Sequence, residues 1–180
     1  MVKYNKQNGF TIVEISITLA LLVILASFAI PSYQQMMQNS RIRTATESIM
    51  TGLQIARAEA VKRNTNVQFN FRGSSISDWT VCLTPSGGGD CPATDDATTI
   101  ESRKNSEGSS ANVTVTTSDA GPYVFNGYGV MVSPTAALTI DIGNSALSGS
   151  RDLRILVGAG GATRSCDPAL DSSGTDPRRC

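Results

Sequence analysis

Glu14 is the one charged side chain in an apolar run that extends from Phe10 to Ile30. A carboxylate inside the hydrocarbon of a membrane costs a few kcal/mol unless it is paired or hydrogen-bonded. Ion pairing with a cation is therefore the chemistry that this acid could do. The alternative is that Glu14 lies near the membrane surface, where its carboxylate reaches water and the positive end of a helix dipole helps to stabilise it.

Four cysteines are the second group of residues whose type could do chemistry. All of them follow the apolar run: Cys82, Cys91, Cys166 and Cys180. An even number of cysteines in an oxidising compartment predicts two disulfides. Four cysteines allow three pairings, and closeness in sequence favours Cys82 with Cys91 and Cys166 with Cys180 without excluding the others. A zinc site is disfavoured, because no C-x-x-C pair occurs and the sequence has no histidine.

The lack of histidine also removes the commonest general base, so we do not expect an enzyme. No cofactor and no metal are predicted. The 15 basic and 15 acidic side chains balance, which gives no global indication of nucleic-acid binding. A chain of 180 residues is long enough for one domain together with a membrane segment.

A membrane-spanning helix is the element predicted to position Glu14. About 20 apolar residues at 1.5 Å per residue cross the hydrocarbon of a bilayer, and the run from Phe10 to Ile30 has that length. Lys3 and Lys6 in front of it place the polar leader on the cytoplasmic side. No small-residue cleavage site of the usual secretory kind follows the run.

Helical periodicity continues after Pro31, which lacks an N–H and is predicted to kink the helix. Apolar residues then recur at spacings of three and four: Ile42, Ala45, Ile49, Leu53, Ala56 and Ala60. This stripe predicts an amphipathic second half that ends near Arg63 and covers a domain core.

After Asn66 the pattern changes to short segments rich in β-branched and aromatic residues. Strands are predicted at 67–71, 79–83, 112–117, 138–142 and 153–157. We expect them to form antiparallel sheet against the helix. The polar tract from Pro85 to Ser110 is predicted to be a surface loop with at most one short strand, at "TTIES".

Gly9, Phe10 and Thr11, followed by Glu14 and a uniformly apolar stretch, resemble the class III signal of type IV pilins and type II secretion pseudopilins. In that family a prepilin peptidase in the membrane cuts after the glycine and methylates the new amino group of the phenylalanine. The resemblance implies cleavage between Gly9 and Phe10 and N-methylation of Phe10. It also implies that Glu14 pairs with the amino terminus of a neighbouring subunit during assembly.

The rest of the chain narrows the resemblance. The segments "IARAEAVKRNTNVQF" and "YVFNGYGVMV", and the stretch from "LRILVGAGGATRSCDP" to the terminal "DPRRC", are similar to the type IV minor pilin FimU/FimT (GspH-like) family. The family has an α+β fold, the type IV pilin fold. In it a long N-terminal helix, half transmembrane and half amphipathic, packs on an antiparallel β-sheet C-terminal domain. The resemblance divides the chain into a leader at 1–9, a transmembrane and filament-core helix at 10–37 and a globular head domain at 38–180.

The function that the resemblance implies is structural. A minor pilin helps to prime a type IV pilus and lies at or near its tip, with other minor and major pilins as partners. Before assembly it rests in the inner membrane with its head in the periplasm, and the extracellular pilus then serves adhesion, twitching motility or DNA uptake. The cysteines in "SCDP" and "DPRRC" favour a minor pilin over a GspH-like pseudopilin of type II secretion, which is one alternative.

A FimT-like DNA-binding role in natural transformation is the other alternative. In that branch a Gly-Arg-x-Arg turn presents two arginines to phosphate, and here Ala162 replaces the first of them while Arg164 matches the second. Arg164, Arg178 and Arg179 are the candidate DNA contacts. Because acidic residues accompany them, the segment from Arg151 onward has only one more basic than acidic side chain, and we expect DNA binding to be weak.

Overall fold

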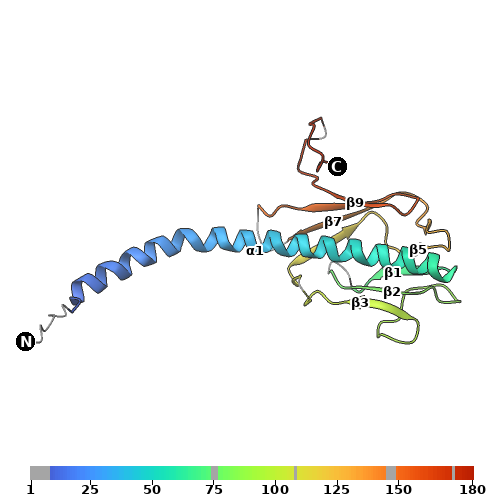
Figure 1. Cartoon of the computed structure of the whole chain (residues 1–180), viewed down its shortest axis with the longest axis horizontal. Helices are drawn as coiled ribbons and strands as arrows, with labels where there is room; N and C mark the ends of the chain where they lie inside the picture. The colour runs from blue at the N-terminus through green and yellow to red at the C-terminus, as the bar shows by residue number, and fades with distance from the viewer. Residues whose placement is uncertain (1–8, 74–76, 108, 145–148, 172) are drawn as a thin grey trace, which may run out of the picture. The chain divides into compact units, whose positions relative to one another are not determined.

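The computed structural model describes residues 9–73, 77–107, 109–144, 149–171 and 173–180 (Figure 1). It divides into two compact units, Met1–Met37 and Gln38–Cys180. The boundary between them falls inside helix α1, Ile12–Arg63.

Helix α1 has a recognisable cap at each end. Thr11 Oγ1 accepts a hydrogen bond from the backbone N–H of Glu14 at 3.2 Å and so caps the first turn. Asn64 follows the last residue, Arg63, and adopts a left-handed φ of 49°, a conformation that commonly closes helices. Lys62 lies with Arg63 in the last turn, next to the negative end of the helix dipole. The predicted end of the helix near Arg63 is confirmed.

The first unit is an apolar helix with its side chains exposed. By length and composition α1 could cross a membrane. Its exposed large apolar side chains in this unit are Ile12, Val13, Ile15, Ile17, Leu19, Leu21, Leu22, Val23, Ile24, Leu25, Phe28, Ile30, Tyr33, Met36 and Met37. Pro31 lies inside α1, which continues through it, and its ring leaves the carbonyl of Ser27 without the usual helical donor.

In the second unit the described strands form two antiparallel sheets. The first sheet has the order β3-β2-β1-β5-β6, with β1 Val67–Phe71, β2 Trp79–Leu83, β3 Thr99–Arg103, β5 Tyr123–Phe125 and β6 Met131–Ser133. The second has the order β4-β7-β8-β9, with β4 Val113–Thr117, β7 Leu138–Asn144, β8 Leu153–Val157 and β9 Thr163–Cys166.

The core lies between the C-terminal half of α1 and the two sheets. Figure 1 shows this half of the helix flanked by β7 and β9 on one side and by β1, β2 and β3 on the other. Gly52 permits a close approach of α1 to the first sheet, since a Cβ there would lie 2.7 Å from the Phe69 ring and 3.0 Å from the Trp79 ring. The Trp79 indole then donates to Ser48 Oγ at 2.9 Å. All six apolar residues of the predicted helical stripe are buried in this core.

The predicted α+β architecture, a long N-terminal helix packed on antiparallel sheet, is confirmed, and the predicted strands have counterparts in β1, β2, β4, β7 and β8. β3 lies in the tract predicted as a loop, at the place where a short strand was allowed for. β5, β6 and β9 were not predicted, and they have only three or four residues each. The prediction of antiparallel sheet against the helix did not specify the number of sheets, and the described strands form two of them.

Candidate functional site

The N-terminal candidates lie at the start of α1. Gly9 and Phe10 precede the helix, and Phe10 is 81% exposed. An added Cβ at Gly9 would meet no atom within 4 Å. The bond between Gly9 and Phe10 is therefore in an exposed, non-helical segment that an enzyme could reach.

Glu14 differs from the other polar residues of the apolar run. The hydroxyl groups of Ser16, Thr18 and Ser27 donate to the helical carbonyls of Ile12, Ile15 and Ile24 at 2.7–2.9 Å. Among the described residues, none forms a hydrogen bond or ion pair with the exposed Glu14 carboxylate. Since every hydroxyl finds a partner within α1, the carboxylate is the one group in the run that would require a partner from outside it.

The first disulfide joins Cys82 to Cys91 across nine residues and holds the loop after β2 over the outer face of β1. Polar side chains on that face support the loop. Gln68 Nε2 donates to the carbonyl of Gly89 at 3.0 Å, and Asn70 Nδ2 donates to Asp90 at 2.7 Å. This disulfide has a structural role in ordering the beginning of the polar tract.

The second disulfide joins Cys166, the last residue of β9, to Cys180. Its sequence separation of 14 residues corresponds to a stabilisation of about 3 kcal/mol through restriction of the unfolded chain. Two further contacts fasten the same segment. Arg151 Nε donates to the buried carboxylate of Asp167, and the backbone N–H of Asp167 donates to the carbonyl of Arg178 at 2.7 Å. The C-terminal segment is thus held against the end of β9.

The arginines near the C-terminus are largely neutralised. Arg154 donates twice to Asp141, its cross-strand neighbour, at 2.6 and 3.0 Å, and these hydrogen bonds raise the pKa of the Arg154 guanidinium. Arg178 donates twice to Asp176, at 2.7 and 3.0 Å, and holds the pKa of that carboxyl at about 2.

The three candidate DNA contacts do not form a row of uncompensated cations. Arg178 is paired with Asp176, so its charge is already compensated. The backbone of Arg179 forms a short parallel bridge with the backbone of Asp167, which does not involve the guanidinium. Arg164 is exposed and donates to the backbone carbonyl of Cys180 at 3.3 Å. The Arg178 charge is therefore not available to phosphate unless its ion pair with Asp176 breaks.

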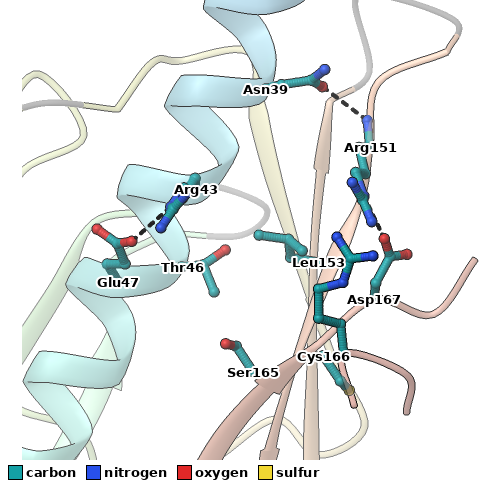
Figure 2. Close-up of a pocket in the computed structure, with 10 residues that line it drawn as sticks. Asn39, Arg43, Thr46, Glu47, Arg151, Leu153, Ser165, Cys166 and Asp167 are labelled. Atoms are coloured by element: carbon teal, nitrogen blue, oxygen red, sulfur yellow. Dashed lines mark hydrogen bonds and ion pairs between the residues drawn. The ribbon is translucent and has the colours of Figure 1, made fainter. Parts of the chain in front are cut away.

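A pocket of about 390 Å³ lies within the second unit, between α1 and the end of the four-stranded sheet (Figure 2). No local sequence pattern indicates this pocket, because its walls come from segments more than 100 residues apart. The lining residues are Asn39, Arg43, Thr46 and Glu47 of α1, and Arg151, Leu153, Ser165, Cys166, Asp167 and Arg178. Asn39 Oδ1 accepts the backbone N–H of Arg151 at 2.9 Å and closes one end of the pocket.

Two kinds of catalytic group, a metal-binding cluster and a free thiol, are missing from the described residues. No group of three or more histidine, cysteine, aspartate or glutamate residues in the described ranges could hold a metal ion. The described cysteines are all in disulfides, so none of them is a free nucleophile.

Comparisons with known proteins agree with this architecture. A family model described as "Type II transport protein GspH" matches residues 45–161, and one described as "Prokaryotic N-terminal methylation motif" matches residues 4–30. No curated protein gives a significant sequence match.

Several solved structures share the fold. The type IV minor pilin FimU of Pseudomonas aeruginosa has 17% sequence identity and a TM-score of 0.53, and the match covers 68% of this chain and 86% of FimU. The minor pseudopilin EpsH from the type 2 secretion system of Vibrio cholerae has 12% identity and a TM-score of 0.52, with coverage of 72% and 99%.

Proposed function

The chain belongs to the GspH family of minor pilins and pseudopilins, and we propose that it is a minor pilin of a type IV pilus. It helps to prime pilus assembly and lies at or near the filament tip, where the pilus serves adhesion, twitching motility or DNA uptake. Its partners are other minor pilins and the major pilin. Its role is structural and not enzymatic.

The observation that carries the proposal is the combination of an exposed apolar helix with one carboxylate, that of Glu14, which has no partner among the residues that the structure describes. Prepilin peptidase removes residues 1–9 and methylates the amino group of Phe10. The helix then resides in the inner membrane, with the head in the periplasm, until the subunit enters the filament. There the amino group of a neighbouring subunit neutralises Glu14, because a buried charge is tolerated when it is paired.

We assign the chain to a pilus and not to a secretion apparatus because of its C-terminal segment. The Cys166–Cys180 disulfide and the Arg151–Asp167 pair fasten the "DPRRC" ending to β9, and this ending is the feature that resembles the minor pilins. The likeness to EpsH keeps a minor pseudopilin of type II secretion as the alternative.

Deletion of the gene separates these two functions. We expect the number of surface pili per cell to fall and to recover when the wild-type gene is supplied in trans, while type II secretion continues. Electron microscopy and pilus shearing measure the first, and the activity of exported enzymes in the medium measures the second. Normal piliation with failed secretion would establish the pseudopilin instead.

We also expect DNA binding to be weak. Phosphate binding depends on several uncompensated cations acting together, and here Arg154 and Arg178 are already paired with acids. A gel-shift titration of the purified chain in detergent at near-physiological salt is expected to give a Kd weaker than about 1 μM. Tighter binding that is lost when Arg164, Arg178 and Arg179 are all replaced by alanine would instead make this a DNA-capturing pilin.

A further inference from the structure

β9 is the edge strand of the four-stranded sheet, so one side of its backbone faces away from β8. The backbone N–H of Gly158 donates to the carbonyl of Ala162 at 2.9 Å. Because hydrogen-bonded and non-hydrogen-bonded pairs alternate along antiparallel strands, this bond determines which residues of β9 bond to β8. The N–H and C=O of Arg164 consequently point toward β8, and those of Ser165 point outward. Ser165 is exposed, and no described backbone group bonds to its outward N–H or C=O.

The C-terminal segment of the chain already pairs with this edge at Asp167, two residues after Ser165. The N–H of Asp167 donates to the carbonyl of Arg178, and Asp167 pairs with Arg179 in a parallel bridge. An extended backbone thus fits beside the end of β9. The pairing stops before Ser165, which is the next outward-facing position.

The space beside Ser165 is the pocket of about 390 Å³ (Figure 2). Figure 2 shows Ser165 on one side and Arg43, Thr46 and Glu47 of α1 on the other. The volume lies in the range of known ligand sites. We call this space between β9 and α1 the β9 slot.

The charges around the β9 slot are already balanced by neighbours. Arg43 pairs with Glu47 at 2.9 Å, and Arg151 pairs with Asp167. Arg178 pairs with Asp176. A nucleic acid requires uncompensated cations, whereas an uncharged extended polypeptide requires free backbone donors and acceptors of the kind that Ser165 presents.

We propose that the β9 slot binds an extended, uncharged segment of a neighbouring pilin, which adds a strand to β9 through the outward N–H and C=O of Ser165. The identity of the partner rests on the proposed function, since a minor pilin has other pilins as its neighbours. The ability of the slot to bind an extended polypeptide through the edge of β9 does not depend on the proposed function.

Ser165→Pro tests the proposal, because it removes the outward N–H while the ladder to β8 does not use that N–H. Proline is tolerated on edge strands where its N–H position faces away from the sheet. Ser165→Ala is the matched control, since it removes the hydroxyl and keeps the backbone donor. A photo-crosslinking amino acid in place of Arg43, in the full chain in its native cells, reports on the occupant of the slot.

We expect the wild type and Ser165→Ala to cross-link to another pilin subunit, identified by mass spectrometry of the joined peptides. Ser165→Pro is expected to lower that yield about tenfold or more. Glu47→Trp provides a second route, because it fills the slot from the exposed helix side and leaves β9 unchanged. Thr51→Trp, one turn further along α1 and outside the slot, is expected to have no effect.

Equal cross-linking by Ser165→Pro, Glu47→Trp and their controls would overturn the proposal, as would a cross-linked partner that is not a pilin. The pilus assignment is read separately, from the presence of the wild-type chain in sheared pili. A Ser165-dependent cross-link without pilus incorporation would retain the slot and refute the pilus assignment. Pilus incorporation without a Ser165-dependent cross-link would retain the pilus assignment and refute the binding role of the slot.

Discussion

Replacing Gly9 by valine is expected to block processing of the chain almost completely. Wild-type chain, expressed with a prepilin peptidase, should lose nine residues and begin with N-methylphenylalanine, whereas Gly9→Val should keep Met1. A peptidase that cuts after glycine must accommodate the residue on the amino side of the bond, and a branched side chain obstructs it. Intact-mass spectrometry of the membrane fraction measures both species.

The chain's own structure makes this substitution informative. A side chain at Gly9 meets no atom within 4 Å, and Gly9 does not have the positive φ that other glycines of this chain adopt. Loss of cleavage would therefore reflect the peptidase and not misfolding. Gly9→Ala is the graded control and is expected to be cut at least in part. Efficient removal of the leader from Gly9→Val would place the cleavage site elsewhere.

Glu14→Val is expected to leave membrane insertion intact and to lower incorporation into pili by more than about tenfold. Loss of one partner of a close, desolvated charge pair typically costs roughly 2–5 kcal/mol, which exceeds the 1.4 kcal/mol that corresponds to a factor of ten. Insertion itself should improve slightly, because the variant removes a charge from the apolar run. Quantitative immunoblots of sheared pili and of membranes measure the two effects.

Thr18→Val is the matched control for Glu14→Val. It also replaces a polar residue of the apolar run by valine, but Thr18 already donates to the carbonyl of Ile15 at 2.9 Å and needs no partner outside the helix. If Thr18→Val enters pili normally while Glu14→Val does not, the effect is due to loss of the carboxylate. Normal piliation by Glu14→Val, in a strain without the wild-type copy, would mean that the acid merely reaches water at the membrane surface.

The parts of the fold that sequence reasoning predicted are those with a strong local pattern. The stripe containing Ile42, Ile49 and Leu53 follows helical periodicity and is buried, because one face of α1 covers the core. β1, β2 and β8 alternate or consist of β-branched and aromatic residues, so their bounds were predicted to the residue. The unusual position of Glu14 was visible because a single acid contrasts with an otherwise apolar run.

The parts that were missed depend on contacts between distant segments. β9 reads "TRSC", which has no apolar alternation, because it is a short edge strand with Arg164 and Ser165 both exposed. The β9 slot brings Arg43 of α1 near residues more than 100 positions later, and no local pattern encodes that approach. The acids near the C-terminal arginines could be counted, but the pairing of Arg154 with Asp141 required the register of β7 and β8.

The central claim is that this chain is a processed subunit of a pilus, and mass spectrometry of sheared, washed pili tests it most directly. We predict that pili from wild-type cells contain this chain in small amounts beside the major pilin, with an N-terminal peptide that begins at N-methylated Phe10. Pili from the deletion strain, collected in parallel, should lack it. Pili that never contain the chain, or that contain it with Met1 still attached, would contradict the account.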